Sequence, residues 1–267
     1  MKTLLYPDPS LIDDTMSELT HHPASYKDPS GFIFSFDGKY YRQVNLSYKD
    51  DYDLFISSGL YVQLKEKNLL LDHEEIDENL SRSANWYKTL LPRQLSFISY
   101  PYEWCFDQLK DAALLTLRIM KICLEHGMIL KDATGFNIQF EEGKPVFIDT
   151  LSFEKYDEKK PWIAYRQFCE CFLFPLLIEH YREINVQKLL SIYLDGIPVG
   201  LTAKLLPGKS RISLGVWLHV FLQNRVANNQ APQKNEVSFS KLKLVRLIDH
   251  LESMIKGLTI NASHKST

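Results

Sequence analysis

Residues 126–140 read HGMILKDATGFNIQF, and after a Glu-Gly-Lys turn at 142–144 the chain continues as PVFID at 145–149. Gly127 is placed to end a long helix, and the residues after it predict a loop that enters a strand. The turn then returns the chain into a second strand, so we expect a hairpin. This pattern places Asp132 in the loop, Asn137 at the start of the first strand and Asp149 at the end of the second.

An acid, an amide and a second acid in this arrangement suit phosphoryl transfer. That reaction needs Mg²⁺ ions held against the nucleotide phosphates and an acid that positions the attacking hydroxyl. A rigid two-stranded ribbon keeps Asn137 and Asp149 on neighbouring ends, so both side-chain oxygens can face one metal ion. The sequence therefore predicts a nucleotide-and-metal centre at Asp132, Asn137 and Asp149.

The elements on either side predict an α+β fold. The apolar stripe between Phe106 and Gly127 indicates a helix that Asp107 caps, and four further helical stretches follow it. On the N-terminal side, 31–36 and 39–44 read as strands joined by an Asp-Gly turn, 95–102 reads as another extended run, and a helix over 50–67 is bent or divided at Gly59. A small sheet-rich lobe followed by a larger helical lobe is the expected architecture. The expected divisions are an irregular arm over 1–28, the small lobe over 29–104, the helical lobe over 105–260 and a frayed tail over 261–267.

The loop and hairpin resemble the protein-kinase-like superfamily, in particular its divergent bacterial and aminoglycoside-phosphotransferase-like members. By this resemblance Asp132 matches the catalytic-loop acid, Asn137 the metal-binding amide and Asp149 the metal-binding acid. The resemblance implies a bilobal kinase-like fold that uses ATP with Mg²⁺ or Mn²⁺. Two departures stand out, because Leu130-Lys131 replaces the usual His-containing approach and Asp149-Thr150-Leu151 replaces Asp-Phe-Gly.

The resemblance also implies cofactor-binding residues in and after the first lobe. The strand that offers a phosphate-binding Lys in kinases offers Arg42 here, with Lys39 as the fallback. The segment 99–104, which includes Tyr102 and Glu103, lies where a hinge would meet the adenine edge. No Gly-rich phosphate loop is visible. The acidic partner of the basic residue is left open between the helix over 50–67 and Glu74-Glu75.

A second resemblance covers roughly residues 28 to 210. The stretches 28–32, 41–45, 100–104, 130–133 and 148–153 are similar to the leading region of bacterial proteins labelled SAM-dependent methyltransferases. A Rossmann-like methyltransferase would need a strand, a Gly-rich loop and a downstream ribose-binding acid, and that pattern is absent from the sequence. We therefore expect the methyltransferase label to describe a fused neighbour domain that is missing from this sequence.

Composition narrows the classes of partner. The chain has 267 residues, a formal net charge of -2 and a pI near 6.5, which gives no global basic field for nucleic acid. The N-terminus shows no signal-peptide core and no stretch is apolar enough to span a membrane, so we expect a cytoplasmic protein. The four cysteines read as reduced core residues.

The expected function is atypical kinase-like transfer of the ATP γ-phosphate to a hydroxyl of an unidentified acceptor, protein or small molecule. The alternative is a pseudokinase-like binding or regulatory module, ancillary to a SAM-dependent methyltransferase. A third interpretation keeps the fold and transfers AMP instead. An activating ligand or partner protein is left open as a requirement.

Overall fold

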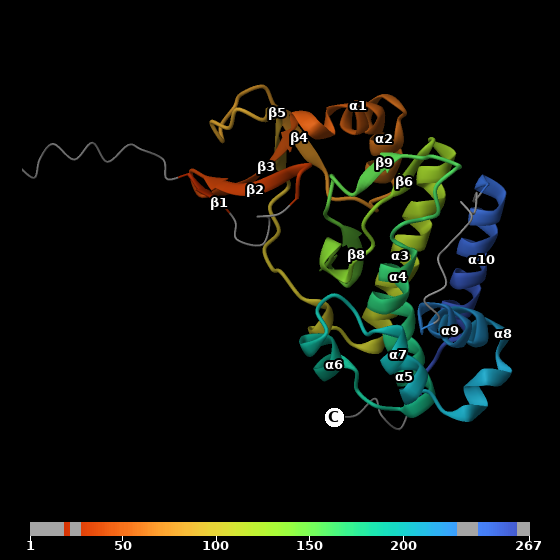
Figure 1. The fold of residues 1–267 in the computed structure, drawn as a ribbon. Helices are drawn as coiled ribbons and strands as arrows, with labels where there is room; N and C mark the ends of the chain where they lie inside the picture. The colour runs from red at the N-terminus through yellow and green to blue at the C-terminus, as the bar shows by residue number, and fades with distance from the viewer. Residues whose placement is uncertain (1–18, 22–27, 229–239, 261–267) are drawn as a thin grey trace, which may run out of the picture. The chain divides into compact units, whose positions relative to one another are not determined.

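The structure is a computed structural model that describes residues 19–21, 28–228 and 240–260. Most of the arm expected over 1–28 and all of the tail expected over 261–267 lie outside the described residues. The chain divides into two compact units, one formed by Met1–Tyr48 with His73–Gln94 and the other by Lys49–Asp72 with Leu95–Thr267. Both units are discontinuous in sequence. The protein is an α+β protein with a small antiparallel sheet and several helices (Figure 1).

The first unit is built on a five-stranded antiparallel sheet in the order β1-β2-β3-β5-β4. The predicted hairpin is confirmed as β2 and β3, and its turn residues Asp37 and Gly38 have φ of 49° and 71°. Two consecutive positive φ values suit the turn that matches strand twist, which explains the Asp-Gly pair. The strands are β1 (Thr20–His21), β2 (Gly31–Phe36), β3 (Lys39–Asn45), β4 (His73–Ile76) and β5 (Trp86–Pro92).

One face of this sheet buries polar side chains among its apolar ones. Gln43 is fully buried; its Nε2 donates to Asn45 Oδ1 over 2.6 Å, and the Ser81 hydroxyl donates to its Oε1. Thr89 is also fully buried, and its hydroxyl donates to the Glu78 carbonyl over 2.6 Å while accepting from Trp86 Nε1. Because the side chains of Gln43 and Thr89 are hydrogen-bonded, these two residues avoid the cost of being desolvated unpaired.

Sequence patterning placed the later strands incorrectly. The extended run expected over 95–102 contains no strand; a 3₁₀ turn at Pro101–Glu103 begins within it. The strands are instead β4 and β5, which the sequence analysis did not identify. Strand β4, with the sequence His-Glu-Glu-Ile, lacks alternating apolar residues. It lies at the edge of the sheet, where it has one neighbouring strand and its other edge faces solvent.

The second unit begins with two short helices, α1 (Lys49–Ser57) and α2 (Leu60–Glu66). The predicted division at Gly59 is confirmed, because Gly59 adopts φ of 81° between them. His126, just after the long helix of this unit, fixes the junction: its Nδ1 lies 2.7 Å from the Ser58 carbonyl oxygen and its Nε2 contacts Gln63 Oε1. The junction is therefore held by hydrogen bonds as well as by backbone conformation.

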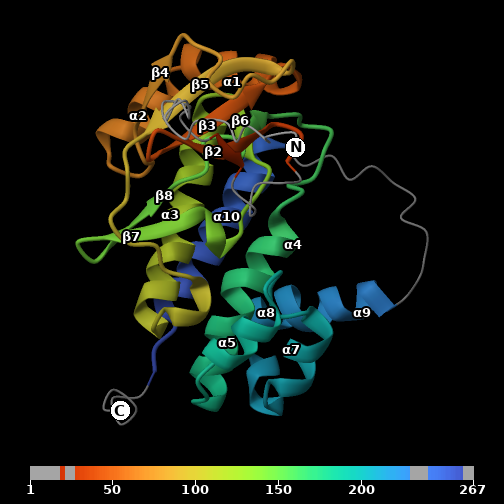
Figure 2. The same ribbon diagram turned by 90° about the vertical axis from the view of Figure 1, so that its left-hand side faces the viewer.

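Helix α3 (Phe106–Glu125) carries the apolar stripe expected from the sequence and lies beside α10 (Lys241–Gly257), as both ribbon views show (Figures 1 and 2). Lys121 of α3 binds Asp249 over 2.6 Å and also binds Glu252, both on α10. The expected cap at Asp107 is wrong: the N-cap is Cys105, whose N–H donates to Gln108 Oε1 over 3.0 Å. Cys105 is exposed, so the expectation of four core cysteines fails there, whereas the other three are buried.

Two short antiparallel strand pairs follow α3. Strand β6 (Met128–Leu130) pairs with β9 (Phe153–Lys155), and β7 (Ile138–Glu141) pairs with β8 (Lys144–Phe147). Leu70 forms a parallel bridge with Phe147. Phe55 of α1 stacks on Phe153 with ring centroids 4.7 Å apart, and both rings are fully buried. This packing fixes β9 against α1.

Apart from α7 (Val199–Leu205), which the sequence did not predict, the remaining helices overlap the stretches that the sequence predicted to be helical, and breaks divide several of those stretches. Glu170 shows one cause of the breaks. It lies in a π-helical stretch, Cys169–Leu173, where the residue five positions on would donate to its carbonyl; that residue is Pro175, which has no N–H. The Ile197 N–H donates to the Glu170 carbonyl instead, over 2.9 Å. Gly196, with φ of 105°, permits this approach, because a Cβ there would lie 2.7 Å from the Glu170 carbonyl carbon.

In the described part of the chain, no helix combines the length and apolar character that crossing a membrane requires. A second π-helical stretch, Trp217–Leu222, joins two of the short helices. The helices beyond α3 are α4 (Tyr165–Phe168), α5 (Phe174–Arg182), α6 (Gln187–Ile192), α7 (Val199–Leu205), α8 (Leu214–Val216), α9 (Gln223–Asn228) and α10.

Candidate functional site

The loop that carries Asp132 is held by hydrogen bonds on both sides. It leaves β6 at Leu130, whose carbonyl accepts from the buried Trp162 indole N–H over 2.8 Å. Within the loop, the Thr134 N–H donates to Asp132 Oδ1 over 3.2 Å, and the Ala133 N–H donates to Gln167 Oε1 over 2.7 Å. An acidic side chain that bonds the backbone two residues on is a stable turn arrangement. The position of the Asp132 carboxylate is therefore fixed by its own loop.

Asn137 and Asp149 are brought together by the β7–β8 hairpin. Asn137 ends a 3₁₀ turn that immediately precedes β7, and Asp149 lies two residues after the end of β8. The Ile148 N–H donates to the Asn137 carbonyl over 2.8 Å, which joins Asn137 to the residue before Asp149. Asp149 Oδ1 accepts from the Leu151 N–H over 3.3 Å. The neighbouring strand ends predicted from the sequence therefore lie side by side.

A buried serine connects the two predicted metal ligands. Asn137 Nδ2 donates to Ser152 Oγ over 3.1 Å, and Ser152 Oγ donates to Asp149 Oδ2. The Ser152 carbonyl also accepts from the Lys131 N–H over 2.9 Å, beside Asp132. Sequence reasoning missed Ser152, because nothing in the local pattern distinguishes it from other serines.

Electrostatics sets Asp132 apart from an ordinary surface carboxylate. Burial is the largest influence and the negative charge of Asp149 the second, and together they raise the pKa of Asp132 above its usual value. Hydrogen bonds from the Thr134 N–H and from the Gln167 and Asn137 side chains act in the opposite direction. A carboxylate with a raised pKa binds a proton more strongly, which favours proton acceptance. Gln167 is a second residue of this site that the sequence did not indicate.

The oxygen donors at the site fit a hard divalent cation. Among the described residues, no group of three or more His, Cys, Asp and Glu side chains is placed to bind a metal ion. Asn137 and Asp149 instead supply one amide oxygen and one carboxylate. Mg²⁺ is bound in nucleotide sites by one or two such groups, with phosphate and water oxygens completing the octahedron. An amide oxygen and a carboxylate are donor types that Mg²⁺ and Mn²⁺ accept.

The two predicted phosphate-contacting residues lie on β3 of the first unit. Lys39 is the first residue of that strand and is exposed. Arg42 is half-buried in the strand interior and lies directly opposite Leu90 of β5. Their placement on β3 agrees with the sequence, which assigned both to the second strand of the hairpin.

Lys88 is a basic residue of the same sheet face that the sequence analysis missed. It lies opposite Val44, two residues from the Arg42–Leu90 pair, and side chains two residues apart on a strand share a face. Its Nζ binds Glu75 over 3.2 Å, and this hydrogen bond is the main cause that raises the pKa of Lys88. Glu75 lies opposite Leu90 on β4. Glu75 was one of the acids left open as the partner of the phosphate-contacting basic residue on β3. In the structure it forms an ion pair with Lys88.

The segment expected to meet an adenine edge forms its own hydrogen bonds. The Ser99 N–H and carbonyl are bonded to Gln139 Oε1 and Nε2 over 2.8 and 3.0 Å. Glu103 Oε2 accepts from the Tyr100 N–H over 2.8 Å, and the Tyr102 ring stacks on that of Tyr100 with centroids 5.4 Å apart. Glu103 and Tyr102 therefore have structural contacts within the segment, and the backbone groups of Ser99 are already bonded.

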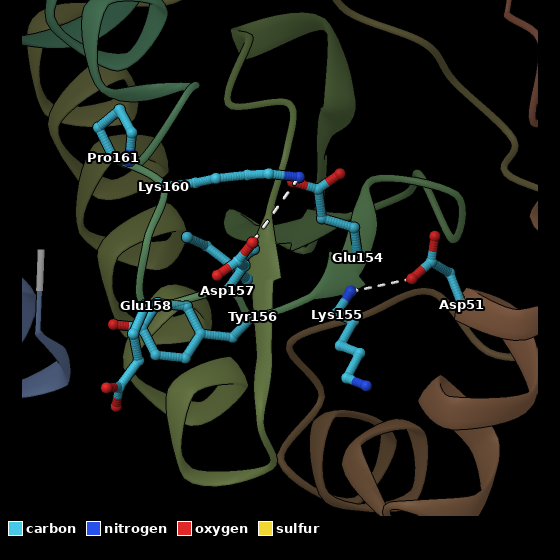
Figure 3. A pocket seen from close by; sticks show the side chains of 9 residues that line it. Asp51, Glu154, Lys155, Tyr156, Asp157, Glu158, Lys160 and Pro161 are labelled. Atoms are coloured by element: carbon cyan, nitrogen blue, oxygen red, sulfur yellow. Dashed lines mark hydrogen bonds and ion pairs between the residues drawn. The ribbon is translucent and has the colours of Figure 1, made fainter. Parts of the chain in front are cut away.

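A cavity of about 550 Å³ opens elsewhere in the second unit (Figure 3). The Lys155 N–H donates to Asp51 over 2.9 Å at one side of it, and Lys160 lies 3.9 Å from Asp157 at the other. Its lining does not include Asp132, Asn137 or Asp149. The residues that line it are Asp51, Ile129, Glu154, Lys155, Tyr156, Asp157, Glu158, Lys160 and Pro161.

Comparison with known proteins gives one informative relationship. No family model matches the chain. The chain resembles a nodulation protein. NoeA of Rhizobium meliloti (strain 1021) is 30% identical over 251 residues, which make up 91% of this chain and 52% of NoeA. The chain spans about half the length of this relative, so the match relates most of the chain to one part of a longer protein.

Proposed function

We propose that this protein is an atypical kinase-like phosphotransferase that moves the ATP γ-phosphate to a hydroxyl of an acceptor. In this proposal the sheet unit corresponds to the small lobe of a kinase-like fold and the helical unit to the large lobe. The observation that carries it is the hydrogen-bonded cluster of Asp132, Asn137, Ser152 and Asp149. A loop acid, an amide and a second acid at the end of a hairpin are the groups that phosphoryl transfer requires.

Each residue has a definite task in this proposal. Asp132 orients the acceptor hydroxyl and accepts its proton, for which its raised pKa is suited. Asn137 and Asp149 hold the divalent cation. The cation, when bound, neutralises charge that develops on the transferring phosphoryl group. Arg42 contacts phosphate, with Lys39 as the alternative on the same strand.

Nucleotide binding is tested by thermal stability with ATP and Mg²⁺ or Mn²⁺. A ligand that binds the folded state raises the unfolding temperature, so the natural protein should show a metal-dependent rise. Asp149→Ala should abolish that rise because the cation loses its carboxylate. Asp195→Ala, which removes an exposed carboxylate outside the hydrogen-bonded cluster, is the matched control and should retain it. Equal rises in the natural protein and Asp149→Ala would sink the proposal.

The transferred group is tested with labelled ATP. If phosphate is transferred, label on the γ-phosphate should appear on the acceptor. Label on the α-phosphate should then remain in ADP. Mass spectrometry of the modified acceptor distinguishes phosphate transfer from AMP transfer, because AMP adds the mass of a nucleotide and phosphate does not. Acceptor attachment of the α-label would replace phosphotransfer with AMP transfer on the same site.

A pseudokinase-like binding module is the second candidate, and one observation favours it. The Ser99 backbone groups that would meet an adenine edge are bonded to Gln139, so base recognition has fewer groups to use. In this version the chain serves a larger protein or a methyltransferase partner, and NoeA is about twice as long. Partner binding that survives Asp132→Ala, together with no ATP-dependent stabilisation, would favour this candidate.

A further inference from the structure

Ser152 is the residue that touches every segment of the candidate site. Its side chain contacts Asn137 and Asp149, and its carbonyl accepts from the Lys131 N–H over 2.9 Å. Its own N–H donates to the Asp149 carbonyl over 3.3 Å. Ser152 is fully buried, so no bulk water competes for these bonds.

The chemistry of the partners fixes the direction of each bond. A hydroxyl has one hydrogen to donate, and Ser152 Oγ donates it to Asp149 Oδ2. The Ser152 oxygen must then accept, which places Nδ2 of the Asn137 amide beside it at 3.1 Å. A flipped amide would put two acceptors together.

The bond to Ser152 orients the Asn137 amide. Because Nδ2 donates to Ser152 Oγ, the oxygen Oδ1 is the group of Asn137 that can bind a cation.

We propose that Ser152 is a positioning residue that orients the Asn137 amide oxygen and the Asp149 carboxylate for a divalent cation. The inference rests on the proposed function, because it assumes that these two residues hold the metal. Groups that orient metal ligands usually change metal affinity by about 10- to 100-fold when they are removed. Ser152→Ala should therefore weaken binding of Mn²⁺ in the presence of ATP by about 10-fold or more.

The experiment measures Mn²⁺ binding by electron paramagnetic resonance with and without ATP, and unfolding temperature without ligand. Ser152→Ala removes the hydroxyl, and Ser152→Cys keeps the shape of the side chain with a slightly larger atom that is only a weak hydrogen-bonding group. Ser210→Ala is the matched control, because Ser210 is also fully buried but its hydroxyl donates to the Pro207 carbonyl over 2.7 Å, in a separate 3₁₀ turn. Asp149→Ala reports on the metal site itself.

The outcomes separate the inference from the proposed function. Weaker Mn²⁺ binding in both Ser152 variants, with ligand-free unfolding temperatures close to that of Ser210→Ala, supports the inference. Natural affinity in either folded Ser152 variant, with loss in Asp149→Ala, overturns the inference and leaves the function standing. Equal weakening in Ser210→Ala, or collapse of ligand-free stability in both Ser152 variants, makes the role of Ser152 structural and also overturns it. If the natural protein binds no Mn²⁺ with ATP, the function and the inference fall together.

Discussion

Asp132 combines a fixed position with a proton affinity raised by its surroundings. The Thr134 N–H holds one carboxylate oxygen, and burial and Asp149 raise the pKa. A general base in such a setting contributes about 10²- to 10⁴-fold to a rate. Substitution of Asp132 alone therefore tests the proton-transfer step of the proposed reaction.

Asp132→Asn should lower the rate of phosphoryl transfer by about 100-fold or more, because an amide cannot accept the acceptor's proton. Nucleotide-dependent stabilisation should persist, since Asn137 and Asp149 remain. The measurements are ATP turnover and the unfolding temperature with ATP and Mn²⁺. Asp107→Asn, which changes an exposed acid in the first turn of α3, serves as the control. An unchanged rate in Asp132→Asn would remove this residue from the mechanism.

At the scale of elements, the break between α1 and α2 depends on one backbone conformation. Gly59 has φ of 81°, and a Cβ there would meet only His126 Cε1 at 3.9 Å, an ordinary contact. Gly59→Ala should therefore cost about 1 kcal/mol of unfolding free energy from backbone conformation alone.

Gly257→Ala is the natural comparison for Gly59→Ala. Gly257 ends α10 and has no positive φ, and a Cβ at this position would have no other atom within 4 Å. Ala should therefore be neutral or stabilising there by up to about 1 kcal/mol. Urea unfolding of both variants measures the difference. Equal stabilities would mean that the left-handed conformation at Gly59 carries no penalty.

Elements defined by short-range patterns were predictable, and contacts between distant segments were not. The hairpin at Asp37-Gly38 and the division at Gly59 follow from local conformational preferences, as does the placement of Asn137 beside Asp149. The roles of Ser152 and Gln167 were not predicted, because they come from hydrogen bonds to residues 15 and 34 positions away in the sequence. No periodicity records such pairings.

At the scale of the whole molecule, Glu179 makes stability depend on pH. Burial raises its pKa from 4.5 to about 7, so the folded state holds a proton that the unfolded state releases between these values. The contribution to stability is full below pH 4.5 and is lost as the pH rises through about 7. The side chain is partly exposed, so we expect a loss of about 1 kcal/mol.

Glu179→Gln should remove this dependence, because the amide carries no charge at any of these pH values. The variant and the natural protein should have similar stability near pH 4.5, and the variant should become the more stable as the pH rises past about 7. Chemical unfolding across this range measures the gap. A gap that stays constant with pH would contradict the assignment of the titration to Glu179.

The close approach of Gly196 to the backbone of Glu170 has a consequence for mutational surveys. Any side chain at Gly196 would meet main-chain atoms, because the Ile197 N–H must reach a carbonyl that Pro175 leaves without a helical donor. In a saturation library selected for activity, this position should be depleted as strongly as an active-site residue. Depletion of variants at Gly196 would then reflect a steric requirement of the fold. Ligand-binding data on the variants are needed to distinguish such a position from one that acts in the active site.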